Sequence, residues 1–203
     1  MLAAARDLIR SGELSMRALA RQLDVAPNAL YSHVRDKTDL LDQLLDDTLS
    51  AVAAPADGPP RAGVEAMMTS TYDTLTAHPE LVLLFLRRQG ARGPNAVALG
   101  QVLAALLARL GVRDVPEARR VLIVHAIGFA AFATTGEVQD PAETRPGFVR
   151  SLRWLLDGMT KAPTEQLAAR LSSGSCTVGG GCSQSGADVL SRLRDGSAAG
   201  VRR

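Results

Sequence analysis

Residues 15–37, SMRALARQLDVAPNALYSHVRDK, restrict the possible folds of this chain more than any other stretch. Ser15 stands where a helix N-cap is expected, and Val25 stands in a three-residue break, where an apolar side chain would fill the turn. Pro27 then takes the first position of a second predicted helix, where its missing N–H costs nothing. The first helix is indicated by apolar residues at helical spacing, namely Met16, Leu19, Ala20 and Leu23. The pattern predicts a helix-turn-helix, whose second helix fits the major groove of DNA.

The second predicted helix extends through Val34, and its first turn is the part that would meet base edges. Asn28 can pair with both N6 and N7 of adenine, and Ala29 can pack on a thymine methyl group. A polar residue in a first helical turn can also be merely solvated, so both interpretations of Asn28 stay open here.

The run Leu30-Tyr31-x-His33-Val34-x-x-Lys37, followed by Leu40-Leu41, is a specific short motif. Together with Leu19-Ala20, Leu23 and Val25, it resembles the tetracycline-repressor (TetR) family of transcriptional regulators. The resemblance covers residues 2–52 by motif, and the helix pattern stays compatible with the family to about residue 160. Family members carry a longer first helix after a basic arm, so this chain either lacks that arm or starts further upstream.

The resemblance implies that several side chains approach the phosphate backbone, which sets register and affinity rather than sequence choice. Pro27 departs from the family, because many relatives hold a polar residue there. Ser32 reads equally well as a DNA contact or as a solvated residue. The residues expected to bind DNA are Arg17, Pro27, Asn28, Ala29, Tyr31, Ser32, His33 and Lys37.

Composition favours an all-α fold. Of the 203 residues 46% are hydrophobic and only 3% aromatic, so the core is expected to consist of Leu, Ala and Val rather than aromatic rings. Ala and Leu lead the helix propensities. The net charge of +2 is a weak argument for nucleic acid. Residues 1–37 hold six basic and four acidic side chains, but residues 1–53 are net negative by two. The DNA prediction therefore depends on the motif and not on a basic domain.

The chain divides into three predicted parts. Residues 1–53 form a three-helix, helix-turn-helix DNA-binding domain, joined to the body by a helix over 36–52 that Asp36 caps. A Pro/Gly-rich linker over 53–63 leads to a helical bundle at 61–171, which includes a last long helix from Gly147, after a break at 141–146. Residues 172–203 are expected to be a disordered tail, whose Cys176 and Cys182 imply no disulfide framework.

The family resemblance implies that the body binds a small-molecule effector. Apolar residues at helical spacing could line a cavity, and polar ones could orient the ligand. Met and Phe at this spacing are also typical of plain core, and His125 could equally be a core or interface histidine. It has no metal-ligand partner at i+4, so no metal and no cofactor are expected. The candidates are Met67, Met68, Thr71, Phe85, Arg88, Asn95, His125, Phe129 and Phe132, with Tyr72 and Gln89 as further possibilities.

The helices over 115–135 and 147–160 are expected to form a homodimer interface, as the last long helices of the family do. Intramolecular packing is the alternative. No signal peptide opens the chain, and the longest apolar run, 121–135, is too short to span a bilayer, so a cytoplasmic protein without membrane contact is expected.

Taken together, the sequence predicts a ligand-responsive, DNA-binding transcriptional regulator that is not an enzyme, namely a homodimeric repressor released from its double-stranded operator by a small molecule. Two alternatives stay open. One is a regulator without an inducer, and the other is a helical small-molecule carrier or enzyme in which the helix-turn-helix is only structural.

Overall fold

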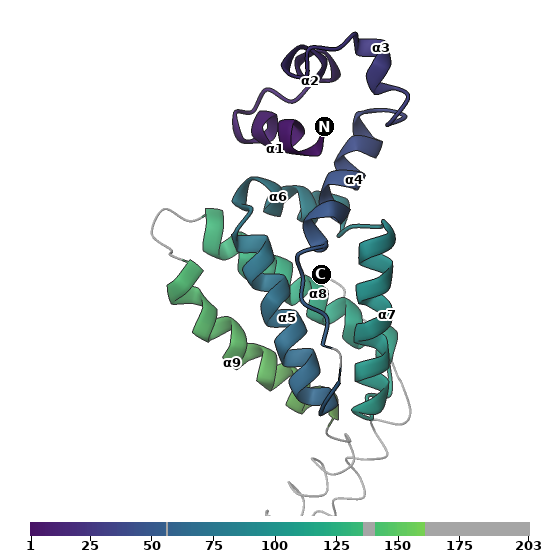
Figure 1. Ribbon diagram of the computed structural model, residues 1–203. Helices are drawn as coiled ribbons and strands as arrows, with labels where there is room; N and C mark the ends of the chain where they lie inside the picture. Colours follow the sequence, from purple (N-terminus) through teal and green to yellow (C-terminus); the bar gives the residue numbers. More distant parts are fainter. Residues whose placement is uncertain (56, 136–140, 161–203) are drawn as a thin grey trace, which may run out of the picture. The chain divides into compact units, whose positions relative to one another are not determined.

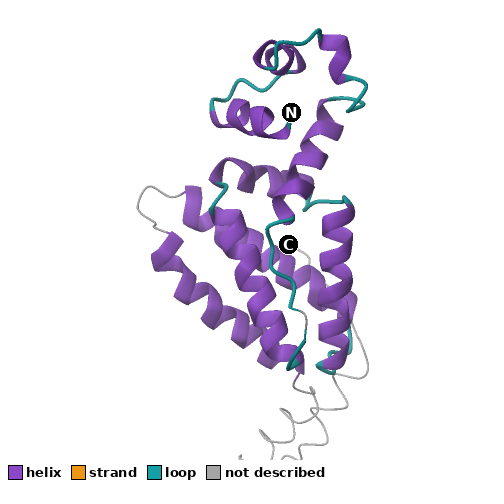
Figure 2. Cartoon of the chain, viewed as in Figure 1, coloured by secondary structure: helices purple, strands orange, loops and turns teal. Residues whose placement is uncertain are grey.

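The computed structural model describes residues 1–55, 57–135 and 141–160. Every regular element in these ranges is an α-helix, which confirms the all-α prediction (Figure 2). The predicted tail at 172–203, with both cysteines, lies outside the described residues. The helices are α1 (Leu2–Arg10), α2 (Met16–Gln22), α3 (Pro27–Leu30), α4 (Lys37–Leu49), α5 (Pro60–Thr76), α6 (Pro79–Arg88), α7 (Pro94–Arg109), α8 (Val115–Thr135) and α9 (Pro141–Thr160) (Figure 1).

Helices α1 to α3 and the first turns of α4 enclose a small hydrophobic core. The Ser15 hydroxyl accepts a hydrogen bond from the Ala18 backbone N–H at 3.1 Å and so caps α2 as predicted. Val25 is 41% exposed and does not fill the turn as expected, because the buried positions are taken by other side chains. These are Ala5, Leu19, Ala20, Leu30, Val34 and Leu40.

The second helix of the motif is shorter than predicted, since α3 ends at Leu30 and residues 31–33 form turns. In a continued α-helix the Ala29 carbonyl would accept the His33 N–H. Here the Ser32 hydroxyl donates to that carbonyl at 2.7 Å, and the His33 N–H donates instead to the Leu30 carbonyl at 3.0 Å. A serine hydroxyl that competes for a backbone carbonyl in this way slightly destabilises a helix, and here it accompanies the end of α3.

Helix α4 belongs to two hydrophobic cores. The Asp36 carboxylate accepts from the Asp39 N–H at 2.8 Å and caps the helix, as predicted. Near this end Leu40 is buried in the core of α1 to α3, whereas Leu44 and Leu45 are buried in the core of α5 to α9.

The body is built around α8, which packs against α5, α6, α7 and α9 (Figure 1). Among the described helices, α8 alone is long and apolar enough to cross a membrane by length and composition. The whole of α8 is longer than the apolar run 121–135 that was expected to be too short, and a third of its most apolar 18-residue window is buried.

Helix α9 starts at Pro141, so the predicted chain break over 141–146 is wrong and Pro146 lies inside the helix. Contacts with α5 hold this first part in place. The Tyr72 hydroxyl bonds to the Pro141 carbonyl at 3.1 Å. The Arg145 guanidinium donates to both carboxylate oxygens of Asp73, at 2.7 and 2.8 Å. These tertiary bonds offset the helix-breaking effect of an interior proline.

Candidate DNA interface and ligand cavity

All the residues predicted to bind DNA are exposed. They lie on α2, on α3, in the turn after it and at the start of α4. Tyr31 is 52% exposed although it is a large aromatic side chain, so it is not part of the core. Asn28 and Ala29 belong to the four-residue α3, and Ser32 is tied to the Ala29 carbonyl.

Lys37 has a structural contact as well as an exposed position. Its ammonium donates to the Leu14 carbonyl at 2.8 Å and so connects the start of α4 to the segment before α2. A lysine ammonium carries three protons, so two remain for a phosphate. The predicted phosphate contact is compatible with this bond.

The acidic residues that make residues 1–53 net negative are engaged within the protein. The Asp42 carboxylate bonds to Arg88 at 2.5 Å, and the Asp47 carboxylate pairs with Arg6 at 3.5 Å. The backbone N–H and guanidinium of Arg35 hold the pKa of Asp39 below its usual value. Of these pairs, the one with Arg88 offsets the net charge of residues 1–53, whereas Arg6 and Arg35 belong to the same segment and leave it unchanged.

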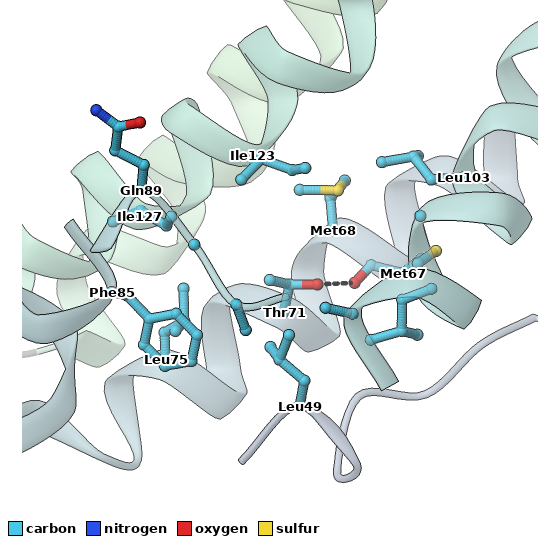
Figure 3. A pocket seen from close by; sticks show the side chains of 15 residues that line it. Leu49, Met67, Met68, Thr71, Leu75, Phe85, Gln89, Leu103, Ile123 and Ile127 are labelled. Atoms are coloured by element: carbon cyan, nitrogen blue, oxygen red, sulfur yellow. Dashed lines mark hydrogen bonds between the residues drawn. The ribbon is translucent and has the colours of Figure 1, made fainter. Parts of the chain in front are cut away.

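A cavity of about 140 Å³ lies in the body, walled by α4 to α8 and the α6–α7 loop. Four of the predicted ligand-binding residues line it, namely Met67, Met68, Thr71 and Phe85 (Figure 3). The Thr71 hydroxyl donates to the Met67 carbonyl at 2.9 Å, so its proton is already used. The other walls are Leu49, Leu75, Gln89, Gly90, Ala91, Ala96, Leu99, Gly100, Leu103, Ile123 and Ile127.

Five predicted ligand residues do not line this cavity. Arg88 and Asn95 bond instead to Asp42 and Asp46 on α4, as described below. Sequence could not reveal these contacts, because the partners lie nearly 50 positions away. The remaining three form a separate region of α8: they are His125, Phe129 and Phe132.

His125 packs among aromatic rings, away from the cavity. Its ring centroid lies 5.1 Å from that of Phe148 and 4.7 Å from that of Phe129. Its Nε2 is 3.2 Å from the Ser151 hydroxyl, and burial lowers its pKa. Phe132 is 65% exposed. His125 is thus half-buried and packs against Phe129 and Phe148, which is compatible with both a core and an interface histidine.

Asp46 on α4 is a functional candidate that the sequence interpretation missed. It is 5% exposed, and its carboxylate accepts the backbone N–H groups of Asn95 at 3.1 Å and Ala96 at 2.8 Å. The Asn95 side-chain amide donates to the same carboxylate at 3.0 Å. Asp46 therefore caps the N-terminus of α7 from another helix. The only sequence signal is the spacing of Asp42 and Asp46, which places both on one face of α4.

Gly93 makes room for this cap. A Cβ at Gly93 would stand 2.3 Å from the Asp46 Cγ, so no larger residue fits without displacing the carboxylate. The loop between α6 and α7 lines the cavity through Gln89, Gly90 and Ala91. Its two flanks are thus held by α4, through Asp42 on one side and Asp46 on the other.

Known proteins similar to this chain are bacterial regulators, although no protein-family model matches it. The chain is 35% identical over 152 residues to an HTH-type transcriptional regulator of Saccharopolyspora erythraea, covering 73% of this chain and 63% of that protein. It is 30% identical over 145 residues to the HTH-type transcriptional repressor DrrR1 of Streptomyces coeruleorubidus, covering 70% of this chain and 53% of that protein. The chain thus spans less than two thirds of the length of these relatives.

Solved structures share the fold. Mycobacterium smegmatis BioQ is 28% identical with a TM-score of 0.67, covering 78% of this chain and 95% of that one. The structure of BioQ with its double-stranded DNA operator is 26% identical with a TM-score of 0.63, covering 78% of this chain and 94% of that one. The Streptomyces coelicolor TetR family protein ActR, in complex with (S)-DNPA, is 22% identical with a TM-score of 0.59, covering 84% of this chain and 91% of that one. At this identity the likeness shows the fold alone. With the helix-turn-helix motif and the all-helical body, the chain has the all-α fold of TetR-family transcriptional regulators and is similar in sequence to HTH-type regulators.

Proposed function

We propose that this protein is a transcriptional repressor that binds an operator in double-stranded DNA and is released by a small-molecule effector. The observation that carries the proposal is that the cavity reaches α4, the helix that also holds the DNA-binding helices. Leu49 of α4 lines the cavity, and Leu40 of α4 lies in the core beneath α3. The relatives support the same function, since they are named as regulators and one as a repressor.

Recognition of DNA is assigned to α3 and the residues around it. Asn28 and Ala29 would face base edges, whereas Tyr31, His33, Lys37 and Arg17 would contact phosphates. The exposure of these side chains and the operator complex of BioQ support this assignment. Such a repressor acts in the cytoplasm, where its operator is.

The effector would act through the loop between α6 and α7. A ligand that fills the cavity presses on Gln89, Gly90 and Ala91, and the flanks of that loop are bonded to Asp42 and Asp46 of α4. A small rotation of α4 then moves the DNA-binding helices. Release follows only if the ligand binds the rotated state more tightly, because differential affinity is what shifts the equilibrium.

A second copy of the chain completes the proposed regulator. Large apolar side chains on α8 and α9 are exposed, namely Val124, Phe132 and Trp154. Covering them with the same helices of a partner gives a two-fold dimer, whose two DNA-binding regions would read half-sites about 34–36 Å apart. Rotation of α4 in both copies would change that separation.

The test is DNA binding as a function of salt, using the DNA upstream of the protein's own gene. Tyr31→Ala and Lys37→Ala are compared with the parent and with Arg113→Ala, an exposed arginine between α7 and α8. We expect a sequence-selective complex that Tyr31→Ala and Lys37→Ala weaken and Arg113→Ala leaves unchanged. Loss of the Lys37 phosphate contact should lower the salt slope by about 1. Because Lys37 also bonds to Leu14, thermal unfolding is measured for each variant.

Absence of selective binding at low salt would contradict the repressor assignment. A regulator without an inducer is the second candidate. It would be favoured if the operator complex formed and compounds bound in the cavity failed to release it.

A further inference from the structure

The cavity is too small to hold a large effector completely. Its volume of about 140 Å³ matches that of an engineered protein cavity, about 150 Å³, that takes up benzene. Its walls are almost entirely apolar, and in Figure 3 the amide of Gln89 points away from the other labelled side chains. The interior therefore suits one uncharged ring or a short alkyl branch, and the rest of a larger molecule must extend outwards.

A second hollow, of about 690 Å³, offers the space for that extension. It lies between α6 and α8 and shares Phe85, Gln89, Ile123 and Ile127 with the inner cavity. Because these four residues line both, the two spaces adjoin. The outer hollow differs from the inner one in its charge, since it is also lined by Arg119 and Arg120.

Arg119 stands at the junction of the two spaces. A guanidinium nitrogen of Arg119 lies 3.6 Å from where a Cβ on Gly100 would be, and Gly100 lines the inner cavity. Within residues 1–55, 57–135 and 141–160, no acidic side chain pairs with Arg119. In contrast, Arg120 pairs with Glu117 at 3.1 Å, and Arg88 pairs with Asp42 at 2.5 Å. Arg119 is thus the cation beside the cavity that is available to a ligand.

We propose that the effector is an amphipathic anion, whose apolar ring fills the inner cavity and whose carboxylate binds Arg119 in the outer hollow. This inference rests on the proposed function, because it names the chemical class of the releasing ligand. A guanidinium holds a carboxylate through two parallel hydrogen bonds, which gives orientation as well as affinity. The anion therefore places the ring with a defined end inwards, towards Met68 and Thr71.

The test uses three probes that differ only in their polar end: phenylbutyrate, phenylbutyramide and phenylbutylamine. Their binding to the full chain is measured by isothermal titration calorimetry. For the parent we expect the carboxylate to bind roughly tenfold more tightly than the amide, since a charge-assisted bidentate pair is about twice as strong as a neutral one. The amine should bind most weakly.

Variants at neighbouring arginines make the test specific. Arg119→Gln should erase the difference between carboxylate and amide, and Arg119→Glu should reverse the order in favour of the amine. Arg120→Gln is the matched control, because Arg120 is already paired with Glu117, and it should keep the parent's order. Both arginines are exposed, so neither substitution disturbs the core.

Equal binding of the three probes, no binding of any at millimolar concentration, or the same loss in both Gln variants would overturn the proposal. A parallel operator-binding assay separates this result from the proposed function. If the operator complex forms while the probes show no charge preference, the effector class is wrong and the repressor stands. If no operator complex forms, the repressor fails whatever the probes do.

Discussion

The proposed DNA-binding helices and the body differ in where their candidate functional residues lie. In α1 to α3 a core of few, mostly small or aliphatic side chains supports candidate residues that all lie outside. In α5 to α9 a larger core that includes Tyr72, Phe85 and Phe148 lies beside a candidate site that is a pocket between helices, partly open to solvent. The first arrangement makes function depend on a few exposed groups over a thin support. The second makes function depend on how well a large core is packed.

The largest expected loss of stability is in the small hydrophobic core beneath the proposed DNA-binding helices. Leu40→Ala removes a fully buried side chain of the small core and should cost about 3 kcal/mol, as such truncations do. DNA binding should then be lost while most helical circular dichroism remains. Leu122→Ala makes the same change in the larger core of the body and is the matched control. Identical losses of helix and of DNA binding in both variants would show that the two cores do not differ in this respect.

The next effect concerns an exposed group. Asn28→Ala should reduce discrimination at a single base pair by about 2 kcal/mol without changing thermal stability. Competition binding with every base of the operator substituted in turn provides the measurement. Ser32→Ala is compared beside it, because the Ser32 hydroxyl is engaged with the Ala29 carbonyl and should contribute less to base choice. A uniform weakening over all sequences would assign Asn28 to phosphate contact instead.

A smaller effect is expected at the contact between the two regions. Asp46→Ala removes the cap of α7 and should lower the free energy of unfolding by about 1 to 2 kcal/mol. It should also reduce the effect of a cavity ligand on DNA affinity. Asp47→Ala is the neighbouring control, because its exposed ion pair with Arg6 contributes little. Gly93→Ala should reproduce the Asp46→Ala result by steric displacement of the carboxylate.

The smallest effect is a pH dependence in the body. Because burial lowers the pKa of His125 below its ordinary value of 6.5, the unfolded chain binds the proton more readily than the folded one. The neutral His125 therefore makes its full contribution to the free energy of unfolding at a pH above that ordinary value. This contribution falls as the pH decreases towards the pKa of His125 in the folded chain. His125→Phe should flatten this dependence in thermal unfolding between neutral and mildly acidic pH. Parallel curves for the parent and His125→Phe would contradict the assignment.

The same contrast explains what sequence could predict. The helix-turn-helix needs particular residues at fixed spacings, so Ser15 and Asp36 were recognised as the caps of α2 and α4, and the motif indicated the fold that the solved structures share. The end of α3 at Leu30 was not predicted, since the helical spacing of the sequence continues to Val34. Which of these residues contact DNA stays a prediction.

The cavity was only partly predictable, because a cavity is defined by where atoms are missing. Helical spacing placed Met67 and Met68 on an inward face, and both line it. Phe132, chosen by the same spacing, is exposed and does not line this cavity. The break expected at Pro146 was wrong, because bonds from Tyr72 to Pro141 and from Arg145 to Asp73 override the local preference of the proline.

The sharing of α4 between two cores has a consequence for building hybrid regulators. Leu40 is matched to one set of helices, whereas Leu44, Leu45, Asp42 and Asp46 are matched to the other. A chimera joined in the Pro/Gly-rich linker after α4 would keep these four residues of α4, which do not match the helices of a body taken from another protein. A junction between Leu40 and Asp42 keeps these two sets of contacts, but it separates Arg6 from its partners Asp47 and Thr48. Transplanting a DNA specificity therefore means splicing inside a helix and exchanging these contact residues as well.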